Sequence, residues 1–287
     1  MSSRISHFRP VPIDNVRQYW NSRPCNLRHS PKAVGTKDYF DEVEVRKYFV
    51  EPHIPRFAQP ERWHGKKVLE IGCGIGTETI NFARNGASVT AVDLSDKSLE
   101  LARRRAEVYQ LQDRIRFYHG DSERLTEFLP IEPYDLIYSF GVIHHSPRPE
   151  AILAQLRNYV HPETEIKIMV YYRYSWKALW IVLTYGKGKF WRMRELVAKH
   201  SEAQTGCPVT YTYSRKEAER LLESGGFRTT SAWVDHIFPY RIRDYIQYRY
   251  VRNWYFRWMP PGLFRWFEQQ FGWHLCVSGI PVSGSPR

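Results

Sequence analysis

The sequence predicts an α/β fold built around a mostly parallel, seven-stranded sheet with helices on both faces. Between residues 65 and 172, short apolar runs alternate with segments of helical periodicity, which is the pattern of βαβ units. The first apolar run leads directly into a glycine-rich turn, and helix and strand patterns resume after residue 213. We expect one compact domain with four zones: 1–64, 65–172, 173–213 and 214–287.

Composition and charge narrow the class of protein. Hydrophobic residues make up 43% and charged residues 25% of the chain, so a packed core is expected. The longest apolar run, 178–183, is far shorter than the roughly 18 residues of a membrane span, and the first ten residues contain no apolar signal region. The 42 basic and 30 acidic residues give a net charge of +12, which favours acidic partners without choosing among them.

The four cysteines, Cys25, Cys73, Cys207 and Cys276, lie far apart and form no CxxC pair. This pattern predicts neither a disulfide framework nor a zinc ribbon, and we expect no metal site. Free thiols and the absence of a signal region predict a cytoplasmic protein. The sequence does not define an oligomeric state.

The elements are expected in the following order. Prolines break the zone 1–64 and leave room for short helices over 14–20 and 36–49. Ser95 is a suitable N-cap for a helix through residue 108. Ser214 and Glu217 form a capping box for a helix that ends at 225–226. The strands are expected at 67–71, 88–92, 115–119, 135–140, 165–172, 227–234 and 273–280.

Aromatic and basic residues are concentrated after residue 172. An insertion over 173–213 follows the fifth strand, and an Arg-rich helix is predicted over 240–259, where Tyr245, Val251 and Trp258 fall on one apolar stripe together with Tyr248 and Tyr255. Three interpretations of this stripe stay open. It packs on the core, it lies on a membrane surface, or it stacks on nucleic acid.

The strongest chemical signal is the segment 68–77, VLEIGCGIGT, in which a buried strand runs into Gly72, Gly74 and Gly76. Glycine allows a positive φ and a close backbone approach to a ligand, and open α/β sheets bind nucleotides at the carboxyl ends of their strands. Thr77 stands where a dinucleotide fingerprint requires its third glycine. Glu70 directs a carboxylate at the same turn, which suits a ligand with positive charge better than a pyrophosphate.

These residues resemble the glycine motif of the class I S-adenosylmethionine-dependent methyltransferases, nearest the ubiquinone/menaquinone and natural-product branch. The resemblance covers about 65–172 and implies a Rossmann-like fold with S-adenosylmethionine as cofactor and S-adenosylhomocysteine as product. It also implies that Asp93 binds the ribose, that Asp121 lies beside the adenine, and that the segment 134–145 faces the transferred methyl group. The residues expected to bind the cofactor are Glu70, Gly72, Cys73, Gly74, Gly76, Asp93, Leu94, Asp121, Ser122, Ser139 and Phe140.

His144 and His145 follow the fourth strand, where the acceptor should meet the cofactor. An imidazole there is able to take a proton from the acceptor as the methyl arrives, and the resemblance slightly favours His145. Alternatively, one histidine only fills the pocket wall, and alignment alone accelerates the in-line transfer.

An N-terminal lid and the start of the insertion are expected to complete an acceptor pocket, with arginines binding an anionic group. The alternative is a solvated N-terminal arm. The residues expected to bind the acceptor are Tyr19, Arg23, Arg28, His29, Tyr171, Tyr172 and Trp176.

The function expected from these features is methyl transfer to an oxygen or nitrogen of a small molecule. An anionic or a lipid-like acceptor stays open. An RNA methyltransferase is the second hypothesis, because the chain is basic. A third is a cofactor-binding scaffold without turnover. Peripheral contact with a membrane is left open.

Overall fold

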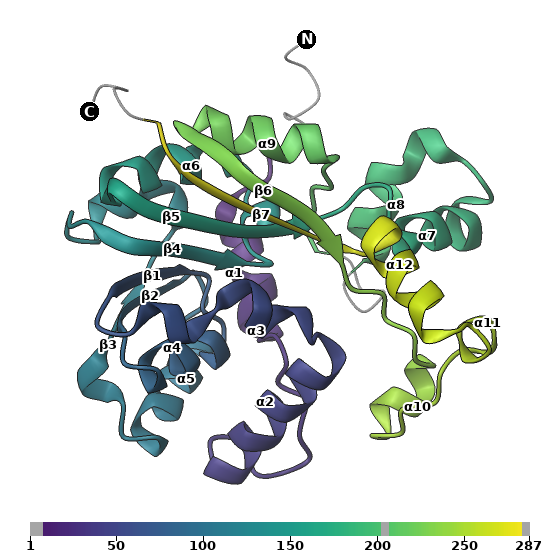
Figure 1. The fold of residues 1–287 in the computed structure, drawn as a ribbon, viewed down its shortest axis with the longest axis horizontal. Helices are drawn as coiled ribbons and strands as arrows, with labels where there is room; N and C mark the ends of the chain where they lie inside the picture. Colours follow the sequence, from purple (N-terminus) through teal and green to yellow (C-terminus); the bar gives the residue numbers. More distant parts are fainter. Residues whose placement is uncertain (1–7, 202–206, 283–287) are drawn as a thin grey trace.

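The structure is a computed structural model that describes residues 8–201 and 207–282. Its centre is a seven-stranded sheet with the order β3-β2-β1-β4-β5-β7-β6 (Figure 1). All neighbouring strands are parallel except β7, which runs antiparallel to both β5 and β6. The strands are β1 (Lys67–Ile71), β2 (Ser88–Asp93), β3 (Ile115–His119), β4 (Tyr134–Phe140), β5 (Val160–Tyr171), β6 (Phe227–Asp235) and β7 (His274–Pro281).

The mostly parallel α/β sheet and its seven strands confirm the fold class predicted from the sequence. Only β5 differs by more than one residue from the expected bounds, because it begins at Val160. Its extra first residues include Pro162 and pair with β4 through a register shift beside Tyr134. A polar, irregular strand end of this kind lacks the apolar run by which the rest of the strand is recognised.

Helices cover both faces of the sheet (Figure 1). Six short 3₁₀ helices join the longer elements: η1 (Pro60–Trp63), η2 (Gln112–Arg114), η3 (Ser122–Glu127), η4 (Ile143–His145), η5 (Arg157–Tyr159) and η6 (Phe190–Arg192). The α-helices are α1 (Ile13–Ser22), α2 (Lys37–Val50), α3 (His53–Ala58), α4 (Thr77–Arg84), α5 (Asp96–Val108), α6 (Pro149–Leu156), α7 (Trp176–Gly186), α8 (Met193–His200), α9 (Arg215–Ser224), α10 (Ile242–Ile246), α11 (Trp254–Arg257) and α12 (Pro261–Phe271). Within the described residues, no helix combines the length and apolarity needed to cross a bilayer.

The alternation of side chains along the strands explains the two layers. In β1, Leu69 and Ile71 pack with α6 and α9, whereas Val68 packs on the opposite face with α3, α4 and α5. A strand that is buried on both faces must be apolar at nearly every position. This is why the central strands read as short continuous apolar runs in the sequence.

Two predicted helix starts are confirmed. The Ser95 hydroxyl accepts the Ser98 N–H at 3.1 Å and begins α5. Ser214 and Glu217 form the expected capping box at the start of α9. These caps satisfy N–H groups that the first turn of a helix otherwise leaves without partners.

The prediction of one long helix over 240–259 is wrong. The segment forms α10 and α11, and the chain between them folds back so that Tyr240 pairs with Arg252. Tyr248 has a φ of +59°, a left-handed conformation that no helix interior contains. The tyrosines gather around the Arg46 guanidinium of α2, which lies 4.0 Å from the ring centroid of Tyr245 and 4.2 Å from that of Tyr248. Attraction between this buried cation and the rings outweighs helical periodicity.

Candidate active site

The glycine turn lies at the carboxyl end of β1 and leads into α4. Gly72, Gly74 and Gly76 have φ values of +75°, +54° and +77°, which side chains rarely adopt. A Cβ on Gly72 would lie 2.2 Å from Val142, while a Cβ on Gly74 would meet nothing within 4 Å. Gly72 therefore allows the turn to pack against the loop after β4, and Gly74 leaves open space above the turn.

Two buried carboxylates flank this turn. The Asp93 carboxylate, at the end of β2, accepts the Gly74 N–H at 2.7 Å and the Ser95 N–H at 2.8 Å. Burial raises the pKa of Asp93, and these two N–H donors partly offset the rise. Asp93 thus fastens the glycine turn to the second strand.

Glu70 lies under the turn and accepts a hydrogen bond from the Thr79 hydroxyl at 2.5 Å. Burial, and next the nearby Glu78 carboxylate, raise the pKa of Glu70 to about 8. Glu78 itself is paired with the buried Lys47 ammonium at 2.6 Å. Within the described residues Glu70 forms no ion pair of its own, so a positively charged ligand above the turn would stabilise its ionised form.

A cavity opens above the glycine turn between the carboxyl ends of β1, β2 and β4 and helix α1. Ten of the predicted site residues line it, and they come from all four sequence motifs. They are Glu70, Gly72, Cys73, Gly74, Asp93, Leu94, Asp121, Ser122, Phe140 and His145.

The other predicted cofactor residues lie just outside the cavity. Gly76 is the N-cap of α4 and packs against Ala102. The Ser139 hydroxyl is buried and donates to the Ile71 carbonyl at 3.2 Å, so it joins β4 to β1.

His145 belongs to the short helix η4 that follows β4. Its Nδ1 lies 2.8 Å from the Val209 carbonyl oxygen. Because a carbonyl only accepts hydrogen bonds, Nδ1 carries the proton, and Nε2 is the basic nitrogen of the neutral ring. Trp20 of α1 packs edge-on against the ring, with centroids 5.1 Å apart.

His144 lies on the other side of η4, outside the residues that line the cavity. It is fully buried against Tyr171, with ring centroids 3.8 Å apart. Burial lowers the pKa of His144 well below its usual value. Of the two histidines, only His145 lines the cavity.

None of the seven residues expected to bind an acceptor lines this cavity. Tyr171, at the end of β5, packs against Trp273, and Tyr172 pairs with Tyr213. Trp176 packs against Tyr255, Phe256 and Phe267 under α12. Tyr19 and Arg23 lie together, His29 contacts Tyr245, and the Arg28 carbonyl accepts from Tyr248.

The lid instead reaches the cavity with Trp20, an aromatic residue expected in the lid, and with residues that the sequence analysis missed. Ile13, Val16 and Trp20 line the cavity from one face of α1, and Cys25 and Asn26 follow in the next turn of chain. The spacing of 13, 16 and 20 is that of one helical face. This spacing could have identified them, whereas the search for charged and aromatic groups selected their neighbours.

A second cluster of polar side chains lies at the same edge of the sheet, beyond Phe140. His53, His236 and His274 are all buried there, and His53 Nε2 is 2.9 Å from His274 Nδ1. Burial lowers the pKa of His53 to about 4 and that of His236 to about 3, so the rings are neutral near pH 7. No sequence motif pointed to this cluster, because its members lie on separate segments.

Comparison with known proteins agrees with these features. Residues 68–163 match the family model described as a methyltransferase domain. The ubiquinone biosynthesis O-methyltransferase of Psychrobacter cryohalolentis is 38% identical over 89 residues, which are 31% of this chain and 34% of that protein. The mitochondrial ubiquinone biosynthesis O-methyltransferase of Schizosaccharomyces pombe is 34% identical over 165 residues, or 56% of this chain and 52% of that protein. The chain thus aligns with about a third to a half of the length of these curated relatives.

The fold is also similar to that of a solved methyltransferase. The magnesium protoporphyrin IX methyltransferase of Synechocystis PCC 6803, crystallised with bound S-adenosylhomocysteine, superposes with a TM-score of 0.59 at 15% identity, over 94% of this chain and 100% of that one. At this identity the similarity establishes the fold alone. Residues 68–163, which match the methyltransferase-domain model and contain the glycine turn with Glu70 and Asp93, therefore form a methyltransferase domain.

Proposed function

We propose that this protein transfers the methyl group of S-adenosylmethionine to an oxygen of a small-molecule acceptor, with nitrogen as the second choice of acceptor atom. The observation that carries the proposal is one cavity that joins the glycine turn, Glu70 and Asp93 to His145. The two relatives are named as O-methyltransferases of ubiquinone biosynthesis. Their names support a small-molecule acceptor over RNA.

The residues around the glycine turn fit the cofactor. Gly74 leaves space for a ligand, and the Asp93 oxygens retain lone pairs for the two ribose hydroxyls. Glu70 supplies a carboxylate for the ammonium group, and Asp121 and Ser122 line the side where an adenine would lie. When bound, the cofactor supplies an electrophilic methyl group on a sulfonium.

His145 would act on the acceptor. Its Nε2 is basic because Nδ1–H is directed at the Val209 carbonyl. His145 Nε2 would take the hydroxyl proton from an acceptor oxygen as that oxygen is methylated. Trp20 packs on the His145 ring and lines the same cavity, so it would help to hold the ring in place during the transfer.

The pH dependence of cofactor binding tests the role of Glu70. Without ligand, Glu70 keeps its proton up to about pH 8, whereas in the unfolded chain it loses it near pH 4.5. A bound ammonium favours the ionised form, so binding releases a proton and affinity rises with pH, by at most about tenfold per unit. Between pH 6 and 7.5 we expect this rise in calorimetric titrations with S-adenosylhomocysteine, while Glu70→Gln should bind more weakly and without the slope.

The proton count separates this effect from other titrating groups. Calorimetry in two buffers of different ionisation enthalpy measures the protons released on binding. Release by the wild type that persists in Glu70→Gln would assign the titration to another group. The same raised pKa also predicts that folding stability decreases from pH 4.5 to 8 without ligand, because the folded state holds the extra proton.

Turnover itself is tested by incubating the full chain with methyl-labelled cofactor and a metabolite extract. Label in small organic products supports the proposal. Label only in RNA would favour the second hypothesis, and cofactor binding without any labelled product would favour a scaffold. We also propose a cytoplasmic location, the compartment expected from the cysteine pattern; none of the four cysteines, all in the described part of the chain, forms a disulfide.

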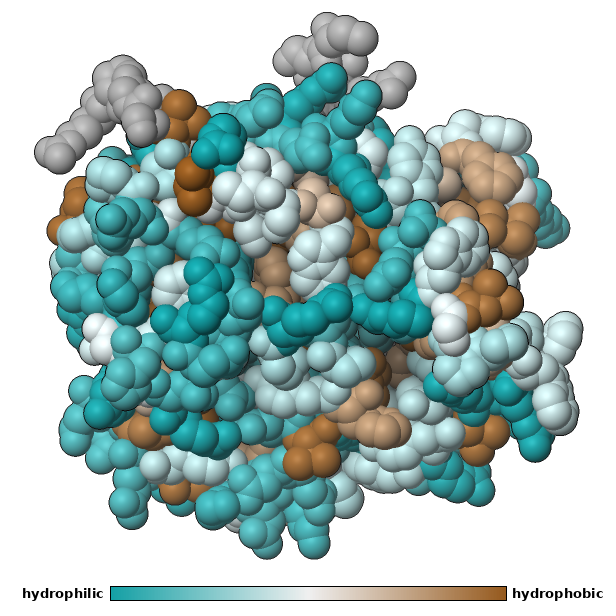
Figure 2. Space-filling view, in the orientation of Figure 1, coloured by the Kyte–Doolittle hydropathy of each residue, from teal (hydrophilic) through white to brown (hydrophobic). Residues whose placement is uncertain are grey.

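We further assign the exposed aromatic surface of α7, η6, α11 and α12 to contact with an anionic membrane surface. Trp191 and Trp258 are each 81% exposed, and Trp254 is 72% exposed. Figure 2 shows apolar side chains at the right of the view, over the region of α7 and α12. Arginines and lysines, including Arg257 beside Trp258, accompany these rings on a chain of net charge +12. Tryptophan and basic side chains together suit the interface of an acidic bilayer.

Vesicle flotation tests this assignment. Wild-type protein should float with vesicles rich in phosphatidylglycerol, and Trp191→Ala with Trp258→Ala should weaken binding about tenfold or more through the lost burial of two indoles. Ile131→Ala removes an exposed apolar side chain elsewhere and should change nothing. Equal binding by all three proteins, or binding that is insensitive to 0.5 M salt, would contradict the assignment.

A further inference from the structure

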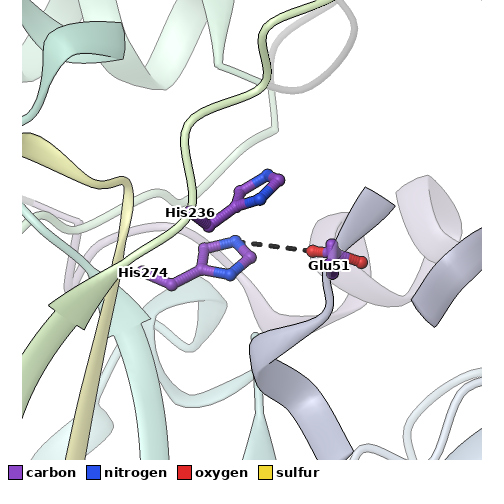
Figure 3. Close-up of side chains that lie close together, drawn as sticks. All are labelled: Glu51, His236 and His274. Carbon is purple, nitrogen blue, oxygen red and sulfur yellow. Dashed lines mark ion pairs between the residues drawn. The ribbon is translucent and has the colours of Figure 1, made fainter. Parts of the chain in front are cut away.

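Three side chains from distant segments converge beyond Phe140. Glu51 follows the C-terminus of α2, His236 follows β6, and His274 begins β7 (Figure 3). One ligand atom of each lies within 4.8 Å of the others, and His274 Nε2 is 3.7 Å from Glu51 Oε1. Two imidazole nitrogens and a carboxylate oxygen are a donor set typical of divalent transition metals such as zinc and iron.

The backbone of His236 is held in an unusual conformation. Its φ is +73°, in the left-handed region that residues with a side chain rarely adopt. Asp235 holds it there, since its Oδ1 accepts the His236 N–H at 2.8 Å. Arg265 donates two hydrogen bonds to the same carboxylate, at 2.7 and 2.6 Å, and Arg56 donates a third at 2.9 Å. This supported turn places the His236 ring beside that of His274, with ring centroids 4.6 Å apart.

The ring of His274 is oriented in a similar way. His53 Nε2 lies 2.9 Å from His274 Nδ1 and is itself buried. If His274 Nδ1–H donates to His53, the lone pair of His274 Nε2 points at the Glu51 oxygen 3.7 Å away. A cation between these two atoms would stabilise this tautomer of His274, whereas the opposite tautomer would direct the Nε2–H at Glu51. Ligating histidines commonly donate their other ring N–H to such a partner.

We propose that Glu51, His236 and His274 form a binding site for one divalent transition-metal ion of the zinc type, with His53 as a positioning residue. At metal–ligand distances of about 2.1 Å, two ligands of a tetrahedral ion lie about 3.4 Å apart. The present separations therefore need only a small inward movement of the side chains. Three protein ligands leave a coordination position open for water or a ligand oxygen.

The site lies beside the proposed acceptor region. Phe140 lines the cavity above the glycine turn and also packs against His274, with ring centroids 5.4 Å apart. Lys47 lines the same cavity one helical turn before Glu51. None of the three ligands itself lines that cavity, so Phe140 and Lys47 lie between the ion site and the cavity. Binding of the ion therefore does not depend on the proposed methyl transfer.

The experiment is a calorimetric titration, with Zn²⁺ alone, of the whole chain after treatment with a chelator. We expect one equivalent to bind with a dissociation constant of about 1 µM or tighter, as three protein ligands allow. His236→Ala and His274→Ala should each weaken binding at least about tenfold, and His53→Ala about ten- to a hundredfold. His64→Ala is the matched control, because this histidine lies before β1 at the opposite edge of the sheet.

Co²⁺ substitution keeps the test decisive if a variant fails to fold. Wild-type protein with one equivalent of Co²⁺ should show the intense visible bands of a four- or five-coordinate ion, and Zn²⁺ should abolish them. Absence of stoichiometric Zn²⁺ binding by the wild type, or equal binding by folded His236→Ala and His274→Ala, would overturn the proposal. Cofactor titrations of the same samples report separately on methyl transfer, since a failed metal site leaves the glycine turn intact.

Discussion

Asp93→Ala should raise the dissociation constant for S-adenosylhomocysteine by about ten- to a hundredfold, or about 1–3 kcal/mol for a lost charged acceptor. The carboxylate has two tasks in the structure. It fastens the glycine turn through the Gly74 and Ser95 N–H groups, and its remaining lone pairs face the cavity. Alanine removes both, because it leaves the two N–H groups without their acceptor and the ribose hydroxyls without a partner.

Two further variants separate these tasks. Asp93→Asn keeps the shape and one oxygen acceptor, so it should retain more of the folding stability than of the affinity. Asp113→Ala removes an exposed carboxylate at the other end of the sheet. It should leave the folding stability and the cofactor affinity unchanged. Calorimetry gives the affinities and thermal unfolding gives the stabilities. Unchanged affinity in a folded Asp93→Ala protein would mean that the ribose is bound elsewhere.

The cofactor half of the site could be predicted because its chemistry is local in sequence. The turn at 72–76 needs glycine for its positive φ values, and Glu70 and Asp93 stand at the ends of adjacent parallel strands. Strands of a parallel sheet that are buried on both faces must be apolar, so the sequence also marks where each begins. Motif order and strand ends together bring these residues to one edge.

The acceptor half depends on contacts between distant segments, which no local pattern records. His145 is oriented by Val209, and the Glu51, His236 and His274 cluster requires β7 to run antiparallel between β5 and β6. The prediction of one helix over 240–259 was wrong for the same reason. Its tyrosines pack around Arg46, a cation almost 200 residues away in the chain, and this contact overrides the helical period.

His145→Ala should lower the turnover number about a hundredfold or more while the cofactor affinity changes little. The expected loss follows from the position of the ring, which lines the cavity with Nδ1–H bound to Val209, so that Nε2 is the nitrogen that would take the acceptor proton. A purely structural role would lower folding stability and cofactor affinity together. Single-turnover measurements with saturating cofactor separate these cases.

The pH dependence of the turnover number distinguishes a His145 that acts as a base from one that only lines the pocket. When the acceptor hydroxyl ionises in solution, it no longer needs a base, so the deficit of His145→Ala should shrink as pH approaches the acceptor's own pKa. His144→Ala is the matched control, since that ring is buried against Tyr171 outside the cavity; it should cost stability but leave the shape of the profile unchanged. Two results would contradict a role of His145 as the base: a deficit of His145→Ala that stays constant with pH, or an equal pH-dependent loss in His144→Ala. Either would show that alignment in the cavity, and not proton removal by His145, accelerates the transfer.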